Sequence, residues 1–366
     1  MDRKNQHYVP QFHLKQWSLN GKQISLYNKQ TGVFVNNKAS IKHVASKDYF
    51  YGQDGVLEEM LGSVEAKVSP IYKKLITSEA PLALSDEEYQ FLCLYIMLCN
   101  ERSLLSGDTF ESLKKEQLRV NLEMHQAHGN YLDIDPNAID DLEVEIPCFN
   151  SIRSVFKYHP IILDLKLILI KNISEADFIT SDCPTIKYNL WALKRSLYSG
   201  WGAGSVGIMF FIPISPRYAV CMYDSTVYSV SGEQRSVLTL KQKTQINEIN
   251  KLMLLNSYRV VFLPGNMPLE YVTNLIKKIP ECKNKQNFIT TLGNQEHRLI
   301  IREPQRINYI ASFSFLRIVP EAMKWYVPNH AAGLMRSSVE EAISISKKMW
   351  EECERDFNGK HPFFMK

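Results

Sequence analysis

The hydrophobic period of this 366-residue chain changes along its length, and the change limits the folds that the chain can adopt. Between residues 56 and 128, apolar side chains recur at intervals of three and four, which is the period of amphipathic helices. From residue 161 onward, short apolar runs bounded by turn residues predominate, as in strands. Helices that cluster early and strands that come later favour an α+β fold over a wound parallel α/β sheet.

The central helix of the first half is predicted to be apolar on almost every side. Ser85 and Glu88 have the spacing of a capping box, in which each side chain satisfies a backbone donor of the other residue. The run FLCLYIMLCN that follows indicates a helix buried all round. We expect a disturbance at Pro70 in the preceding helix, and a more polar helix at residues 109–128.

The same patterns divide the chain into three packed subdomains, since domains usually hold about 100 to 200 residues. Residues 1–158 are predicted to contain short strands and a helical subdomain. Residues 159–265 are predicted to form a core built on a mainly antiparallel or mixed β-sheet. Residues 266–366 form an α/β extension with C-terminal helices and with strands at residues 298–303 and 307–315.

Composition places the protein among soluble globular chains. Apolar residues make up 45% and charged residues 22%, close to the usual averages of about 45–50% and 25%. No apolar run approaches the roughly 20 residues that a membrane span needs. The charged N-terminus lacks the apolar region of a secretory signal, and seven scattered cysteines without a CxxC spacing fit reduced thiols. We therefore expect a cytoplasmic protein.

Charge is unevenly distributed along the chain, although the net charge is only +4. Residues 277–306 hold seven basic and three acidic residues, whereas residues 133–145 hold six acids and no base. The basic stretch faces a polyanion such as nucleic acid, or it is a solvated surface. Its candidate ligand-binding residues are Lys277, Lys278, Arg298 and Arg302.

Several segments have the spacing of known functional motifs but lack the neighbouring structure or residues that those motifs require. GWGAGSVG has the spacing of a dinucleotide fingerprint, but a strand follows it, so no helix N-terminus is available for NAD or FAD. In VEAK, Glu65 and Lys67 lie on a predicted helix and point apart, unlike the E-x-K of restriction-type nucleases. His125 and His128 lack a third zinc ligand. The sequence contains no ATP-binding P-loop, no GxSxG and no HExxH.

Arg102 continues the face of the apolar helix at its C-terminal end. A buried guanidinium must be paired, because an isolated buried charge is very costly. The predicted acidic partners are Asp182 and Glu65, the latter on the margin of the preceding helix. The pair is either a structural salt bridge or a site that anchors an anionic ligand.

Asp182 lies in FITSDCP, where a predicted strand ends before a proline-constrained turn. Loops at strand ends commonly carry functional groups, so Asp182 is a candidate binding residue. Alternatively, its carboxylate caps backbone donors in an Asx-type turn. Asn247 and Asn250, at i and i+3 on one helical face, complete a polar pocket or are surface amides.

The segment HYVPQFHLK near the N-terminus is the most distinctive motif of the chain. Pro10 favours extended, polyproline-like backbone, and the apolar residues after it would tie this arm across a core. His7 is then left at the polar end. Because histidine titrates near neutral pH, His7 is a candidate catalytic or ligand-binding imidazole, with a hydrogen-bonded structural histidine as the alternative.

With this motif in place, the chain resembles a bacterial family of unknown function, DUF4238-like, whose members open with an HYVPQ-like segment. The similarity covers roughly residues 5–265 and includes ASKDYFY, LEEMLGSVEAK, the NER ending at Arg102, FITSDCP, FIPISP and INEIN. The resemblance implies a bacterial protein from a mobile or phage-defence locus, and it implies no particular activity, cofactor or catalytic residue. Cys183 stands after TSD, where such families commonly have Asn.

Three hypotheses about function follow from these residues. The first is a defence- or mobile-element-associated effector that acts on nucleic acid as a metal-dependent nuclease. Glu65 and Asp182 would hold Mg²⁺ or Mn²⁺, His7 would act as general base, and Arg102 would stabilise phosphate charge. The second is a non-enzymatic sensor or toxin-like protein that recognises a phage or host protein, with these residues in a closed ion network. The third is a small-molecule hydrolase or transferase.

Overall fold

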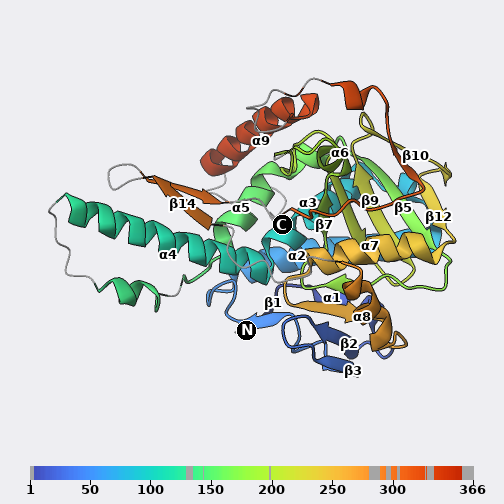
Figure 1. Cartoon of the computed structure of the whole chain (residues 1–366), viewed down its shortest axis with the longest axis horizontal. Helices are drawn as coiled ribbons and strands as arrows, with labels where there is room; N and C mark the ends of the chain where they lie inside the picture. The colour runs from blue at the N-terminus through green and yellow to red at the C-terminus, as the bar shows by residue number, and fades with distance from the viewer. Residues whose placement is uncertain are drawn as a thin grey trace.

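The computed structural model of the protein has the α+β fold that the sequence predicts (Figure 1). It describes residues 4–128, 135–142, 144–197, 199–279, 289–293, 298–302, 306–325, 327 and 334–356. The α-helices are α1 (Gln11–Leu14), α2 (Val56–Ser78), α3 (Asp86–Glu101), α4 (Leu104–Ala127), α5 (Phe149–Tyr158), α6 (Leu190–Lys194), α7 (Lys243–Asn256), α8 (Leu269–Lys277) and α9 (Ser337–Asp356). The strands are β1 (Asn5–His7), β2 (Gln23–Asn28), β3 (Phe34–Ser40), β4 (Ser46–Asp48), β5 (Lys166–Asn172), β6 (Thr180–Ser181), β7 (Ile186–Tyr188), β8 (Met209–Pro213), β9 (Tyr218–Tyr223), β10 (Tyr228–Val230), β11 (Glu233–Gln234), β12 (Val237–Leu240), β13 (Val260–Leu263), β14 (Ile289–Gly293), β15 (Arg298–Arg302) and β16 (Leu316–Ile318).

A mixed six-stranded sheet lies at the centre, in the order β11-β12-β5-β9-β8-β7, which confirms the predicted sheet type. β12 runs parallel to β5, and the other neighbours are antiparallel. Successive side chains point to opposite faces of a sheet. Leu169 and Phe210 accordingly pack with α2, α3 and α5, whereas Ile170 and Phe211 pack with α7. Both faces are covered, which agrees with the apolar side chains along β8 and β9 and in the middle of β5.

A second sheet, in the order β3-β2-β13-β6, connects the N-terminal region to the middle of the chain. β13 pairs with β2 on one side and with β6 on the other, both antiparallel. This sheet joins strands from residues 1–158 to strands from residues 159–265. The N-terminal arm packs beside it, where the buried Trp17 donates a hydrogen bond from Nε1 to the carbonyl of Phe178 at 2.8 Å.

The helices follow local signals closely. The capping box of Ser85 and Glu88 is present at the start of α3. α2 continues through Pro70 without a break, so the disturbance expected there does not end the helix. α4 begins at Leu104 rather than at residue 109, because the Ser103 hydroxyl caps its first turn. In the part of the chain that the structure describes, no helix combines the length and apolar character needed to cross a membrane.

Residues 306–315, which precede β16, form no strand, so the strand predicted at residues 307–315 is wrong. The N–H groups of this segment donate to core side chains instead of to a neighbouring strand. Ser312 N donates to the Glu248 carboxylate at 3.0 Å, and Ser314 N donates to the Gln245 side-chain oxygen at 2.8 Å. Phe313 is buried in the core that includes α7. The segment is thus tied to the body through both polar and apolar contacts.

Arg336 fixes the segment that leads into α9. Its side chain is only 5% exposed and donates to both carboxylate oxygens of Asp164, at 2.7 and 3.0 Å. It also donates to the carbonyls of Ala203 and Ser205, at 2.9 Å each. A bidentate, charge-assisted contact of this kind specifies geometry as well as energy. The C-terminal region is therefore bound to the same body as the central sheet.

His13 makes the stability of this fold sensitive to acid. The imidazole is fully buried, with Nε2 2.8 Å from the Thr180 hydroxyl, and burial lowers its pKa to about 3. The unfolded chain, with a histidine pKa of about 6.5, binds more protons between these two values, so stability rises with pH there. We expect the free energy of unfolding to be about 2 kcal/mol lower at pH 5 than at pH 7 from His13 alone.

Urea unfolding at a series of pH values measures this dependence. His13→Gln keeps a group that can hydrogen-bond to Thr180 but removes the titration, so its pH slope should be shallower than that of the wild type. The buried His159, whose pKa is lowered to about 4 by burial, contributes a residual slope of the same sign. Equal slopes for the two proteins would show that His13 does not stay neutral in the folded state.

Candidate functional site

Three of the four residues predicted as catalytic meet at the end of α3. Arg102 donates from Nη1 to Glu65 Oε1 at 2.8 Å and from Nη2 to the His7 carbonyl at 2.7 Å. Its Nε donates to the Tyr51 hydroxyl at 3.2 Å. The expected acidic partner is therefore Glu65 and not Asp182. Three of the five guanidinium N–H groups thus have protein acceptors.

Neighbouring elements bring this cluster together by ordinary local folding. Arg102 is the C-cap residue of α3, and Glu65 projects from the middle of α2, which packs alongside α3. The guanidinium side chain is 2% exposed, whereas Glu65 is 26% exposed. The Tyr51 ring lies 5.5 Å from the guanidinium carbon. We call Arg102, Glu65, Tyr51 and the His7 carbonyl the Arg102 network.

His7 enters this network through its backbone more than through its ring. β1 pairs with β4, which holds the arm in place, and the imidazole Nε2 lies 3.1 Å from the Ile41 carbonyl. Burial lowers the pKa of His7, opposed by the Ile41 contact and by the charge of Glu65. A ring held neutral and hydrogen-bonded to a carbonyl fits the structural alternative that the sequence left open.

Asp182 makes no hydrogen bond to the Arg102 network and bonds to backbone N–H groups instead. Its Oδ1 accepts from Tyr258 N at 2.9 Å, and its Oδ2 accepts from Arg259 N at 2.6 Å and from Val260 N at 2.9 Å. Burial raises the pKa of this carboxyl, and the three backbone donors oppose the rise. Asp182 thus caps the start of β13, but its donors lie 76–78 residues further along the chain, so these contacts are not the local Asx-type turn that the sequence suggested.

Glu65 and Asp182, the two predicted metal ligands, bond to different partners: Glu65 to the Arg102 guanidinium, and Asp182 to backbone N–H groups. Within the described residues, no cluster of three or more His, Cys, Asp or Glu side chains has metal-binding geometry. His125 and His128 belong to no such cluster of described residues, and His128 Nδ1 lies 2.7 Å from the Met124 carbonyl.

The two predicted amides belong to a different place, on the face of α7 that meets α8. Asn250 is fully buried: Oδ1 accepts from Ile179 N at 3.1 Å, and Nδ2 donates to the Asp177 carbonyl and to the Tyr271 hydroxyl, both at 2.8 Å. The Tyr271 hydroxyl donates in turn to Asn247 Oδ1 at 2.6 Å. Asn250 is therefore a positioning residue that fixes Tyr271 and, through it, Asn247.

Asn247, Tyr271 and Asp177 border a cavity of about 400 Å³, which we call the Asn247 pocket. One wall comes from α7, with Lys243 and Asn247, one turn apart on the same helical face. A second wall comes from α8 and the loop before it. The third wall is the turn after β5 that carries Glu175 and Asp177. Of the sequence-predicted ligand residues, Asn247 and Lys278 line this pocket directly.

Charges of both signs surround the pocket without neutralising one another. Lys243 and Lys278 contribute ammonium groups, and Glu175 and Glu270 contribute carboxylates. Among the residues that the structure describes, none of these four side chains takes part in an ion pair. The Lys243 ammonium lies 6.0 Å from the centre of the Tyr271 ring. The charged groups at the rim are thus available to a ligand.

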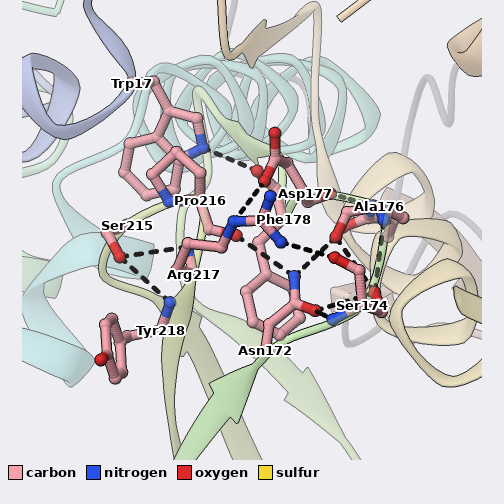
Figure 2. Close-up of polar contacts among 11 residues, drawn as sticks. Trp17, Asn172, Ser174, Ala176, Asp177, Phe178, Ser215, Pro216, Arg217 and Tyr218 are labelled. Carbon is pink, nitrogen blue, oxygen red and sulfur yellow. Dashed lines mark hydrogen bonds and ion pairs between the residues drawn. The ribbon is translucent and has the colours of Figure 1, made fainter. Parts of the chain in front are cut away.

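The turn that forms the third wall is firmly held, as Figure 2 shows. Asn172 Nδ2 donates to the Ala176 carbonyl at 2.6 Å, and Arg217 Nη1 donates to the Ser174 carbonyl at 2.6 Å. Arg217 Nε lies 3.0 Å from Asp177 Oδ1, an ionic contact without hydrogen-bond alignment. Burial raises the pKa of Asp177, and the Arg217 charge opposes the rise.

The basic stretch predicted from the sequence is divided by the fold. Lys277 is exposed at the end of α8 and does not line the pocket, unlike its neighbour Lys278. Arg298 and Arg302 begin and end β15, in the β14–β15 hairpin beside α4. Figure 1 places that hairpin far from α8. Lys283 and Lys285, also in this stretch, lie outside the described residues.

The sequence reasoning missed most of the pocket. Lys243 was detectable in principle, because it lies four residues before Asn247 and so shares its helical face. Glu270, Asn274 and Lys278 repeat the same four-residue spacing on α8. Glu175 carries no such signal, since only the tertiary fold brings its turn against the two helices.

Comparisons with known proteins identify a family and nothing finer. A family model described as a protein of unknown function, DUF4238, matches residues 5–263. No curated protein and no solved structure matches the chain. The matched residues include the Arg102 network, Asp182, and the α7 and Glu175 walls of the Asn247 pocket. The α8 wall lies beyond the match.

Proposed function

The chain belongs to the DUF4238 family of proteins of unknown function, and we propose that it binds a small polar molecule in the Asn247 pocket. The observation that carries the proposal is a cavity of about 400 Å³ bordered by unpaired charges and amides. Pockets for small ligands commonly have volumes of about 300–1,000 Å³ with a few placed polar groups. The pocket therefore has both the size and the chemistry of a ligand site.

The rigidity of the pocket walls supports the same proposal. Asn250 is held by three hydrogen bonds and fixes the Tyr271 hydroxyl, which in turn orients Asn247. Polar groups that are oriented before the ligand arrives cost less entropy on binding. The Asn172 and Arg217 contacts hold the third wall in a similar way.

The contacts of the Arg102 network favour a structural role for it over a catalytic one. A nuclease that used Glu65 and Asp182 as metal ligands would require Glu65 to leave Arg102 and Asp182 to release three backbone N–H groups. A closed, paired Arg102 network therefore favours the sensor or toxin-like hypothesis over the nuclease. The separate Asn247 pocket further favours a small ligand, so a protein that binds a small molecule is our proposal, ahead of nuclease action on DNA or RNA and ahead of recognition of a phage or host protein.

Thermal-shift screening followed by calorimetry tests the proposed function. The panel contains nucleotides, sugar phosphates, carboxylic acids, polyamines, amino acids and short peptides. Asn274→Trp places a large ring on the pocket side of α8 and should abolish binding of any true ligand. Lys278→Ala should weaken binding of a ligand with an anionic group at least about tenfold, equivalent to about 1.4 kcal/mol.

Lys277→Ala is the matched control. It removes the same kind of charge from the residue next to Lys278, and the Lys277 side chain does not line the pocket. The affinity of this variant should stay within about twofold of the wild type. Binding that survives Asn274→Trp, or a panel in which no compound binds, would overturn the proposal. Cleavage of DNA or RNA by the purified protein in the presence of Mg²⁺ or Mn²⁺ would support the nuclease hypothesis instead of the ligand-binding proposal.

A further inference from the structure

We infer that the ligand of the Asn247 pocket is a small zwitterion, of the class of free amino acids and short peptides. This inference rests on the proposed function and deepens it. The inference follows from the presence of both positive and negative groups around one cavity. The positive groups are Lys243 and Lys278, and the negative groups are Glu175 and Glu270. A molecule with one anionic and one ammonium group is complementary to both pairs.

Within the described residues, the four charged side chains around the pocket are not paired with other protein charges. An unbound pocket whose own lysines and glutamates paired with each other would need no charged ligand. In the described part of the chain, these four form no ion pair, while Asp177 is already in contact with Arg217. The Asp177 charge is thus offset locally. The remaining charges balance as two cations and two anions.

Other ligand classes fit this charge pattern less well. A phosphate dianion would be attracted by the two lysines but repelled by Glu175 and Glu270 at the same rim. A polyamine would meet the reverse conflict with Lys243 and Lys278. A neutral sugar would leave all four charges without a partner. Only a ligand of both signs satisfies both pairs together, and charge pairing of this kind acts mainly on specificity.

The size and the remaining lining agree with that class. About 400 Å³ corresponds to the liquid volume of roughly a dozen water molecules. This space suits an amino acid or a dipeptide. Met267 and Leu275 provide an apolar part of the wall for a side chain, and Asn247 and Asn274 provide amides for backbone polar groups. Amide side chains both donate and accept, as a peptide unit requires.

Calorimetric titration with matched chemical forms tests the inference. The probes are the common free amino acids and glycyl dipeptides, each beside its C-terminal amide and its N-acetyl form. The amide lacks the anion, and the acetylated form lacks the cation. For the best-binding probe, each modification should weaken binding at least about tenfold.

Two exposed-residue variants link each end of the ligand to the protein. Lys278→Ala should weaken binding of the free probe but have little further effect on its amide, which has no anion to lose. Glu270→Gln should weaken binding of the free probe but have little further effect on its N-acetyl form. Lys277→Ala should leave every affinity unchanged. Melting temperatures close to that of the wild type confirm that the variants are folded.

The outcomes separate the inference from the proposed function. If the modified forms bind as tightly as the free probe, or if a phosphate, polyamine or sugar binds more tightly at a site blocked by Asn274→Trp, the zwitterion inference is overturned and the pocket function stands. If no compound of either set binds, the proposed function itself is overturned.

Discussion

A chain that ends at residue 265 is expected to lose cooperative folding. The family match ends at residue 263, and the sequence alone suggests that the last hundred residues are an extension. The structure places part of that region inside the main core instead. Phe313 and Phe315 are 8% and 4% exposed and pack into the cluster that contains α7 and the central sheet. Removing them would expose one face of that cluster.

Polar groups of the core would also lose their partners in the truncated chain. Glu248 accepts from the Ser312 N–H and the Tyr309 hydroxyl, both at 3.0 Å. The Tyr188 hydroxyl accepts from Ala311 N at 3.0 Å. A buried polar group left without a partner costs about 1–3 kcal/mol. Folded proteins are stable by only about 5–15 kcal/mol in total, so the combined losses are expected to unfold the chain.

Urea unfolding followed by near-ultraviolet circular dichroism would show this loss as the absence of a cooperative transition. Two point variants in the full chain grade the effect. Phe313→Ala should lower the free energy of unfolding by about 3–5 kcal/mol. Ile310→Ala changes a residue on the same segment that is 56% exposed, and it should cost less than about 1 kcal/mol. A truncated chain with the unfolding midpoint of the wild type would contradict the prediction.

Arg102→Met is expected to destabilise the fold about as strongly as Phe313→Ala. It removes three donors at once and leaves Glu65, Tyr51 and the His7 carbonyl without them. Breaking a buried ion pair by removing one partner typically costs about 3–5 kcal/mol. Lys67→Ala is the control: it breaks an ion pair between Lys67 on α2 and Glu87 on α3, whose side chains are 60% and 64% exposed, and it should cost less than about 1 kcal/mol.

A double-mutant cycle with Glu65→Gln separates the ion pair from the rest of the network. Removing the Glu65 charge should recover part of the stability lost in Arg102→Met, so the double variant should be more stable than the sum of the single changes predicts. Arg102→Met with a loss below about 1 kcal/mol, or strictly additive effects, would show that the network is not structural and that Arg102 is available to a ligand.

Features that depend on near neighbours in the chain were predictable. The capping box at Ser85 and Glu88 involves residues three apart, and the buried character of α3 is visible in its apolar run. The strands of the central sheet were visible as short apolar runs, whereas the parallel pairing of β12 with β5, which makes the sheet mixed, joins segments almost 70 residues apart. The strand predicted at residues 307–315 failed because period alone does not say whether a strand or a set of core side chains will accept the backbone hydrogen bonds.

The sequence by itself determined the family, the fold class, and the fact that Arg102 would be buried and paired. It left two acidic partners open, and only the tertiary structure decided between them. Glu65 meets Arg102 because α2 packs on α3, whereas Asp182 meets three backbone N–H groups about 76–78 residues later in the chain. The Asn247 pocket was likewise decided by packing, since its walls come from segments that no short-range pattern connects. Hydrophobic period records which side of an element is buried, but contacts between distant segments depend on how all the elements pack together.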